Sequence, residues 1–292
     1  MAMEQLPSDG PQRGPNASWL TGGVRTVPAW RHGDAAMQLD RVVDETPVAL
    51  VFNGVSHAVM MATPRDLEDF ALGFALTEGL LDSVNDLRGI DLVERCEGLE
   101  ASLEVSAACA WRLKERRRTL AGRTGCGLCG VDSLAQIVRP TRPVRSSCVA
   151  PGAISKAHEA LRESQEIQRL TGGCHAAAWC DRQGEVVLAR EDVGRHNALD
   201  KLVGAMVRRQ IDATDGFVFI TSRASFEMVQ KTAAAGIGAL VAISAPTSFA
   251  IEAARASGVA LAGFARGASF VGYALPERFG LTECVVTAPG QV

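Results

Sequence analysis

The sequence predicts an α/β protein in which a three-layer α/β/α domain follows a smaller α+β unit. From residue 174 onward, short apolar runs alternate with helical patterns of about three turns, as in parallel strands joined by right-handed crossovers. The chain is 47% hydrophobic but only 5% aromatic, which suits an α/β core of Ala, Val, Leu and Ile better than a sandwich or a disulfide scaffold. Its 292 residues are enough for two folded units.

Charge and hydropathy narrow the class of partner. The formal net charge of −3 gives no electrostatic reason to expect a nucleic acid or a membrane. No apolar run reaches the length of a membrane span, and residues 1–31 are rich in Pro, Gly and polar side chains without a signal-peptide pattern. We therefore expect residues 1–34 to be a disordered tail on a cytoplasmic protein.

The smaller α+β unit is expected over residues 35–112. Its first two strands should form a hairpin, because Asn53-Gly54 between two apolar runs is a strong turn signal. A helix should begin at Thr63, since a capping residue followed by Pro64 is a favoured helix start. The expected strands are Val48–Phe52, Ala58–Ala62, Ile90–Val93 and Leu103–Val105. The expected buried face of the helix is Leu67, Phe70, Ala71, Phe74 and Leu81.

Residues 113–148 have a different composition and are expected to form an exposed, mobile linker. Residues 114–118 are all charged, and four of the five are basic. A glycine- and cysteine-rich loop follows, and then the segment Arg139–Pro143 with two prolines. This linker would carry the pair of cysteines at 126 and 129 between the two units.

The α/β/α domain is expected over residues 149–292, and we find no internal repeat. A polar helix leads through Thr171–Gly173 into two strands, and strands and helices then alternate to residue 263. The expected helices are Ile154–Leu170, Gly194–Arg208, Ala224–Ala235 and Ser248–Ala256. The expected strands are Cys174–Cys180, Glu185–Arg190, Phe217–Ile220, Ala239–Ser244 and Val259–Gly263.

The loop Gly125–Gly130 is the strongest candidate for chemistry. A reactive cysteine needs exposure and help in losing its proton, because the thiolate is the nucleophile. Cys126 lies between two glycines, and Arg123 nearby would favour the thiolate. Cys129 could resolve or protect a sulfur carried on Cys126, so we predict a sulfur-transfer loop with Cys126 as the carrier.

Three other interpretations of the pair were weighed. A structural zinc site needs four ligands, and one Cys-x-x-Cys motif supplies two. A thioredoxin-like motif would start a helix after a strand, whereas this loop lies between domains. A zinc nucleoside deaminase shares the α/β/α layers but needs a glutamate two residues after its histidine, and Ala177 stands there after His175. We therefore predict no metal ligands and no deaminase activity.

Three strand ends in the larger domain suggest a crevice for a phosphorylated ligand. In open α/β sheets the ligand lies beyond the carboxyl ends of the strands, and hydroxyls, helix amino ends and arginines bind phosphate there. The alternative is ordinary helix capping by Ser222 and Thr247 with surface arginines. The candidate ligand residues are Thr221, Ser222, Arg223, Phe264, Ala265, Arg266, Gly267, Ala268 and Ser269.

The segment Glu191–Asn197 places charge and a histidine where a strand becomes a helix. Asp192 could cap that helix and His196 could pack against it. Alternatively both line the ligand pocket, with Asp192 reading guanine N–H groups or His196 assisting a sulfur step. His158 carries no functional prediction.

An ordered set of motifs runs from about Asp44 to the end of the chain. The motifs are Asn53-Gly54, Thr63-Pro64, Gly73-Phe74, Glu78-Gly79, Arg123–Gly130, Thr171–His175, Glu191–Asn197, Thr221–Arg223 and Gly263–Gly267. Together they resemble the formate dehydrogenase accessory sulfurtransferase family, FdhD.

This resemblance implies a sulfur carrier that takes persulfide sulfur from a cysteine desulfurase. Such a carrier would pass the sulfur to the molybdenum cofactor, in its bis-molybdopterin guanine dinucleotide form, before that cofactor is inserted into formate dehydrogenase. The resemblance also implies Cys126 as the carrier, cofactor contacts at Phe264–Ser269, a cytidine-deaminase-like larger domain and a homodimer. The chain departs from the expected polar or basic residues at Ala268 and Ser269, which leaves Arg266 as the phosphate contact. A rival function is a cofactor-delivery chaperone without sulfur chemistry.

Overall fold

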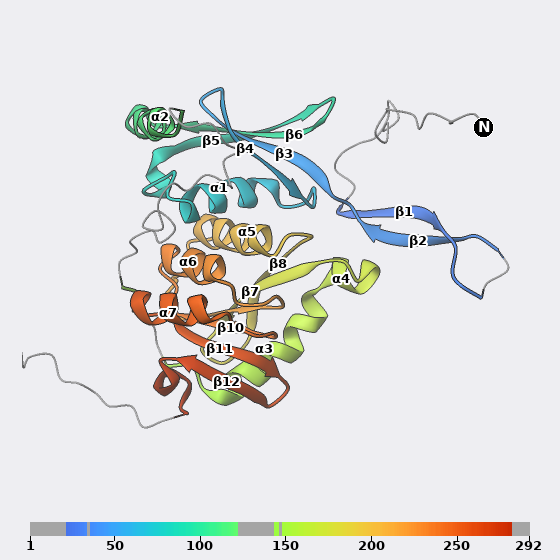
Figure 1. Ribbon diagram of the computed structural model, residues 1–292, viewed down its shortest axis with the longest axis vertical. Helices are drawn as coiled ribbons and strands as arrows, with labels where there is room; N and C mark the ends of the chain where they lie inside the picture. Colours follow the sequence, from blue (N-terminus) through green and yellow to red (C-terminus); the bar gives the residue numbers. More distant parts are fainter. Residues whose placement is uncertain (1–21, 34–35, 122–142, 146–147, 282–292) are drawn as a thin grey trace, which may run out of the picture.

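The alternation of strands and helices after residue 174 forms one six-stranded sheet, in the order β12-β11-β10-β9-β7-β8. The computed structural model describes residues 22–33, 36–121, 143–145 and 148–281, although not the side chains of 116–121 (Figure 1). The strands of this sheet are β7 His175–Asp181, β8 Val186–Asp192, β9 Gly216–Ile220, β10 Ala239–Ala242, β11 Ala260–Arg266 and β12 Ser269–Ala274.

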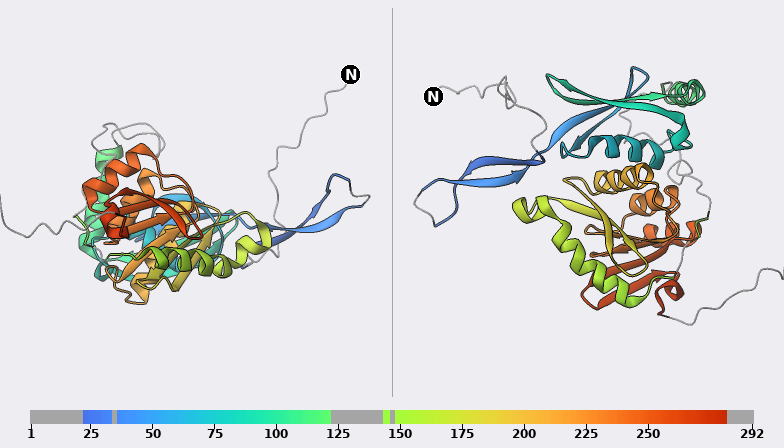
Figure 2. Two further views of the ribbon diagram at one scale, coloured as in Figure 1. Left: turned by 90° about the horizontal axis from the view of Figure 1, so that it is seen from below. Right: turned by 180° about the vertical axis from the view of Figure 1, so that it is seen from behind.

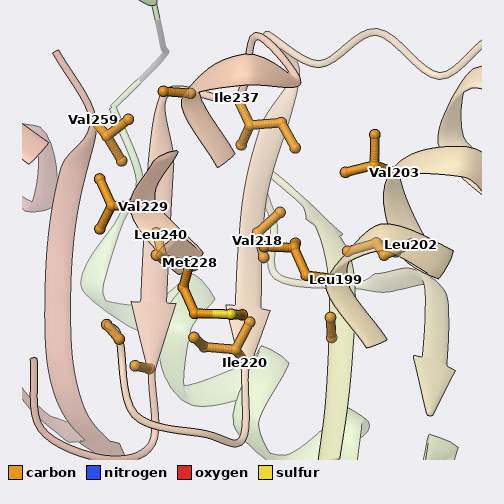
Figure 3. Packing of buried hydrophobic residues seen from close by; sticks show 14 of the residues in the cluster. Leu199, Leu202, Val203, Val218, Ile220, Met228, Val229, Ile237, Leu240 and Val259 are labelled. Carbon is orange, nitrogen blue, oxygen red and sulfur yellow. The ribbon is translucent and has the colours of Figure 1, made fainter. Parts of the chain in front are cut away.

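Helices cover both faces of this sheet, so the larger unit has three layers. One face packs against α5, α6 and α7 in a cluster of aliphatic side chains, which Figure 3 shows around Val218, Ile220 and Leu240. The other face packs against α3, mainly through Ile154 and Leu161. The helices are α3 Pro151–Ser164, α4 Glu166–Thr171, α5 Arg195–Arg208, α6 Phe226–Ala234 and α7 Ser248–Ser257. The likeness to cytidine deaminases stays a prediction.

Strand directions in the sheet are mixed. Parallel pairing is confirmed for β9, β10 and β11, which are joined by α6 and α7. In contrast, β7 is antiparallel to both β8 and β9, and β12 is antiparallel to β11. The short connections from β7 to β8 and from β11 to β12 cannot carry a crossover, so they impose antiparallel pairing.

The smaller unit is a four-stranded sheet, in the order β4-β3-β6-β5, with α1 against one face. The four expected strands are all present. All five residues predicted for the apolar face of the helix are buried in this core, although Leu81 lies beyond the end of α1 at Thr77. Figures 1 and 2 show α1 lying between the four-stranded sheet and α5. The elements are β3 Thr46–Phe52, β4 Val55–Ala62, α1 Leu67–Thr77, the short 3-10 helix η1 Val84–Asp86, β5 Leu87–Arg95, β6 Gly98–Val105 and α2 Ala107–Ala121.

Three features of the fold differ from the sequence prediction. Residues 24–29, expected in the tail, form β1 (Val24–Ala29), which pairs with β2 (Gln38–Val43) in an arm that projects from the body in both figures. Residues 113–121, expected in the linker, continue α2, and Cys109 and Leu113 pack this helix against the small core. The strand β12, with its turn at Gly267, and the final 3-10 helix η3 Pro276–Phe279 were not predicted.

Two helix boundaries also differ. The expected helix 154–170 is divided between α3 and α4, because Gln165 leaves helical geometry with φ −86° and ψ 79°. The helix α1 begins at Leu67 rather than at Thr63, which is not a cap. The polar groups of Thr63 bond to the larger unit instead, as described below.

The two units are joined by close contact between α1 and α5. A β-carbon on Gly73 would lie 1.7 Å from the carbonyl oxygen of Asp200, and one on Gly204 would lie 1.9 Å from that of Asp69. Neither helix backbone could approach so closely with any larger residue at these positions. The side chain of Asp69 also binds Arg190 of β8 and Arg208 of α5. The two units therefore share one tightly packed interface.

This contact predicts that Gly73→Ala destabilises the fold, although alanine normally favours helices. The added methyl must displace backbone atoms of α5, so the free energy of unfolding should fall by about 3 kcal/mol. Gly152→Ala is the matched control, because that helical glycine has open space around its β position. Thermal and urea unfolding should show a lower midpoint for Gly73→Ala alone, and equal midpoints would contradict the close contact.

Candidate functional site

The three predicted strand ends adjoin one another at the carboxyl edge of β9, β10 and β11. After β9, Ala224 forms a parallel bridge with Pro246, which follows β10. At the end of β11, the N–H of Phe264 donates to the carbonyl oxygen of Ser244 at 3.2 Å. The segments that the sequence analysis selected therefore form one continuous edge, which is the place where open α/β sheets bind ligands.

The segment after β9 presents one exposed polar side chain. The hydroxyl of Thr221 accepts a hydrogen bond from the N–H of Ala176 at 2.9 Å, which ties the end of β9 to the start of β7. Ser222 is buried, and its hydroxyl donates to the carbonyl oxygen of Arg223. Both hydroxyls thus serve the fold, and Arg223 is the group of this segment that faces solvent.

Helix capping explains only part of this edge. Thr247 caps α7, because its hydroxyl accepts from the N–H of Ala250 at 3.3 Å. Ser222 is not a cap, because α6 begins after Ser225. The amino ends of α6 and α7 both lie beside the strand ends, so their partial positive charge adds to that of Arg223.

The segment Phe264–Ser269 turns from β11 into β12. Phe264 has φ +53°, a strained value for a non-glycine residue, and its side chain is 45% exposed. Arg266 is also exposed. Its charge lies close enough to His158 of α3 to help lower the pKa of that imidazole, after burial and Arg162. The Nδ1 atom of His158 accepts a hydrogen bond from the N–H of Gly267 at 3.3 Å, so this histidine supports the turn, although no role was predicted for it.

Asp192 lies fully buried at the end of β8. Its carboxylate accepts hydrogen bonds from the backbone N–H groups of Thr63 and Gly194, and it pairs with Lys201 at 2.6 Å. The side-chain amide of Asn197 donates to the same carboxylate at 3.0 Å. Four donors around one buried carboxylate leave it no surface for a ligand, so the geometry favours a positioning role for Asp192 over contact with guanine.

Two partners of Asp192 could not be predicted from the sequence, because each is in an unusual setting for its residue type. Lys201 is fully buried, whereas lysine is normally exposed, and its ammonium also donates to the carbonyl oxygen of Thr63. Thr63 imitates a helix cap in sequence. Helical spacing gave no signal for Lys201, because two residues after Leu199 a side chain lies nearly on the opposite side of α5.

His196, in the first turn of α5, is partly buried beside α6. Burial and then the charge of Arg195 lower the pKa of the imidazole to about 4, so it is neutral at physiological pH. Its Nε2 atom lies 4.0 Å from the carboxylate of Glu227 and has no hydrogen-bond partner among the described residues. This nitrogen is enclosed by the fold, so the geometry gives no direct ligand contact to His196.

A second buried ion pair lies one turn along α5. Asp200 accepts from the ammonium of Lys231 at 2.9 Å and from the hydroxyl of Thr77 at 2.6 Å. Glu78 of the small unit also binds Lys231 at 2.8 Å. Burial raises the pKa of Asp200, whereas the carboxylates around Lys231 outweigh its burial and raise its pKa. This cluster fixes α1, α5 and α6 together beneath His196.

The cysteines divide into groups with different chemistry. Cys126 and Cys129, the predicted sulfur-transfer pair, lie outside the residues that the structure describes. Burial, and then the charges of Glu191 and Asp192, raise the pKa of Cys174 to about 12, so this thiol stays protonated and unreactive. Cys109 and Cys180 are also buried, whereas Cys96 and Cys148 are exposed.

A small hollow of about 90 Å³ lies between the start of α1, the break between α3 and α4, and β8. Ion pairs cross it, including Arg65 with Glu166 at 2.9 Å and Arg190 with Asp66 at 3.6 Å. None of the predicted ligand residues lines it. Its full lining is Arg65, Asp66, Ser164, Glu166, Ile167, Ala189, Arg190 and Glu191.

Within the described ranges, no cluster of three or more His, Cys, Asp or Glu side chains is arranged to hold a metal ion. The same part of the chain contains no helix that is long and apolar enough to cross a membrane.

The family model described as FdhD/NarQ matches residues 43–280, which include every strand-end segment described above. The chain belongs to the FdhD/NarQ family. The match confirms the resemblance inferred from the motifs, and it excludes most of the arm β1–β2.

Curated relatives of this FdhD/NarQ member are named sulfur carrier protein FdhD. The relative from Bordetella petrii is 56% identical over 248 residues, covering 85% of this chain and 89% of the relative. The relative from Cupriavidus necator is 49% identical over 279 residues, covering 95% of this chain and 97% of the relative.

A crystal structure of a candidate formate dehydrogenase accessory protein from Desulfotalea psychrophila has the same fold. Its TM-score is 0.67 at 23% sequence identity, and the match covers 88% of this chain and 98% of that one.

The depressed pKa of His196 predicts a specific pH dependence of stability. Between about pH 6.5 and about pH 4 the unfolded chain binds a proton at this histidine that the folded chain resists, so the free energy of unfolding falls as the pH is lowered through this window. Stability from this source is fully present above about pH 6.5. Between pH 7 and pH 5 the free energy of unfolding should fall less in His196→Gln than in wild type. The difference should be below about 1 kcal/mol per pH unit, because solvent screens the partly exposed ring.

Urea unfolding at pH 7 and pH 5 measures this difference, since carboxylate titration is common to both proteins. His32→Gln, at an exposed histidine, controls for the loss of an imidazole. An equal drop in wild type and His196→Gln would contradict the burial of this ring.

Proposed function

We propose that this protein is a sulfur carrier of formate dehydrogenase maturation. The observation that carries the proposal is its membership of the FdhD/NarQ family, with relatives named sulfur carrier proteins at about half sequence identity over most of the chain. The sequence adds a pair of cysteines, Cys126 and Cys129, in the glycine-rich setting that suits an accessible thiolate.

The sulfur donor is a cysteine desulfurase that holds a persulfide. The thiolate of Cys126 attacks the outer sulfur of that persulfide, the donor's S–S bond breaks, and the donor cysteine leaves as a thiolate. No net oxidation occurs, because one S–S bond replaces another. The product is a persulfide on Cys126.

Release of this sulfur as sulfide requires two electrons, and Cys129 can supply them. Attack of the Cys129 thiolate on the Cys126 sulfur forms a disulfide between the two residues and expels hydrosulfide. A cellular thiol then reduces the disulfide and resets the pair. The acceptor in this proposal is the molybdenum cofactor, before its insertion into formate dehydrogenase.

The carboxyl edge of β9–β11 fits the phosphates of the bis-molybdopterin guanine dinucleotide cofactor as a substrate. Arg223 and Arg266 are exposed there and can bind phosphate, and the amino ends of α6 and α7 add N–H donors. The exposed ring of Phe264 adds an apolar surface. A cytoplasmic location and a homodimer belong to the same proposal, on the basis of the family resemblance.

Sulfur loading tests the carrier directly. Wild type incubated with a cysteine desulfurase and cysteine should gain one sulfur atom on Cys126, located by mass spectrometry of its peptides. Cys126→Ala should lose that sulfur and at least about 100-fold of the transfer activity, because the nucleophile is gone. Cys96→Ala and Cys148→Ala control for other exposed thiols and should load as wild type does.

Full sulfur transfer in Cys126→Ala would overturn the sulfur-carrier function. If cysteine variants still supported formate dehydrogenase while Arg266→Ala did not, the cofactor-delivery chaperone would be the better function. The exposed arginines of the carboxyl edge are the observation that favours this alternative.

Binding of GDP, a fragment of the cofactor, tests the carboxyl edge separately. Because GDP would bind the folded state, millimolar GDP should raise the melting temperature of wild type, and Arg266→Ala should reduce that rise. Arg182→Ala is the control, because Arg182 is exposed in the turn between β7 and β8 and pairs with Asp215. An unchanged melting temperature in wild type would contradict the binding site without bearing on the cysteine chemistry.

A further inference from the structure

The outer face of α2 carries side chains that the fold does not use. Trp111 is 65% exposed, an unusual state for tryptophan, and Lys114 one turn later is also exposed. Ala107 and Ala108 on the same side are exposed and small, so they leave the indole ring uncovered. We refer to Ala107, Ala108, Trp111 and Lys114 as the outer face of α2.

The opposite face of α2 accounts for its attachment to the small unit. Cys109 and Leu113 are buried in the core, and the thiol of Cys109 donates to the carbonyl oxygen of Leu80. Arg112 pairs with Asp82 and Asp86 at 3.0 Å each. Lys114 is exposed and makes no ion pair with any described residue.

The charged residues of this helix are mostly positive. Residues 112–118 contain five basic residues and one acidic residue, which gives a net charge of +4 in a chain whose total is −3. Helical spacing places positions 111, 114 and 118 along one side of α2. Exposed tryptophan together with basic side chains is the composition of a protein interaction site, in which aromatic and arginine residues supply most of the binding energy.

The position of α2 in the chain, shortly before Cys126, indicates that a protein bound to its outer face would exchange sulfur with that cysteine. Its last residue, Ala121, precedes Cys126 by five positions, so the cysteine can lie at most about 17 Å from the end of the helix. A protein held on the outer face of α2 would therefore have its reactive group within reach of that cysteine. A partner that exchanges sulfur with Cys126 is the partner for which this proximity matters.

We propose that the outer face of α2 is the docking surface for an acidic patch on the sulfur-delivering protein. Trp111 anchors the contact, and Lys114, in a segment of net charge +4, steers an acidic surface toward it. This docking rests on the proposed sulfur-carrier function and adds to it the place where the donor binds. A nucleic acid would also match the charge, but the negative total charge of the chain argues against it.

The test compares two sulfur sources on the full chain. A cysteine desulfurase with cysteine requires docking, whereas inorganic polysulfide delivers sulfur without it. Trp111→Ala and Lys114→Glu should each lower the initial rate of sulfur loading from the desulfurase by about tenfold at low salt, and their loading from polysulfide should match wild type. The desulfurase rate of wild type should also fall as sodium chloride is raised, and that of Lys114→Glu should depend on salt less steeply.

Trp30→Ala and Arg169→Glu are matched controls, because Trp30 is exposed after β1 and Arg169 is exposed in α4. Both should load from the desulfurase at the wild-type rate. Circular dichroism and melting temperature establish that the α2 variants remain folded. Loading from polysulfide shows that Cys126 remains reactive in them.

Desulfurase loading of Lys114→Glu and Trp111→Ala at the wild-type rate would overturn the docking surface. So would binding of single-stranded RNA by wild type that Lys114→Glu abolishes while its sulfur loading is unchanged. If wild type took sulfur from polysulfide but not from the desulfurase, the donor docking would fail and the carrier function would stand. If wild type took sulfur from neither source, the carrier function itself would fail.

Discussion

The helices α1 and α5 pack at backbone contact, and this contact joins the small unit to the three-layer unit. Gly73 and Gly204 let the two helix backbones touch, and buried ion pairs lie at either end of this contact. Charges are tolerated there because each is surrounded by hydrogen-bond partners, whereas removal of one partner would leave a buried charge unpaired. The small unit and the three-layer unit therefore behave as one framework for the elements at their margin.

Asp192 connects the interface between the two units to the amino end of α5, where His196 lies. The residue ends β8, holds the amino end of α5 through Gly194, and binds Thr63 of the small unit. The position of the amino end of α5, and of His196 within it, thus depends on contacts between the units as well as on the sheet.

The local sequence pattern was sufficient to predict a helix or strand wherever buried residues recur at the spacing of that element. The strands β3 to β6 and the helices α5, α6 and α7 were predicted because their apolar residues recur at strand or helix spacing. The strand-end segments were predicted because topology brings the carboxyl ends of parallel strands together. Prediction failed at Thr63, whose sequence imitates a helix cap, and at Lys201, whose burial requires a carboxylate from another element. It also failed for β1 and β12, which are stabilised by pairing rather than by a hydrophobic pattern of their own.

Motif spacing and residue chemistry are local properties, so the family resemblance, the cysteine pair and the candidate groups at the carboxyl edge could be inferred from the sequence. Which of these groups face solvent depends on the tertiary structure. Arg223 and Arg266 are exposed there, whereas Asp192 and Ser222 are enclosed by partners from distant parts of the chain. It also exposed Trp111 beside a basic helix that had looked like a linker. Exposure is a property of packing between segments, and no single segment encodes it.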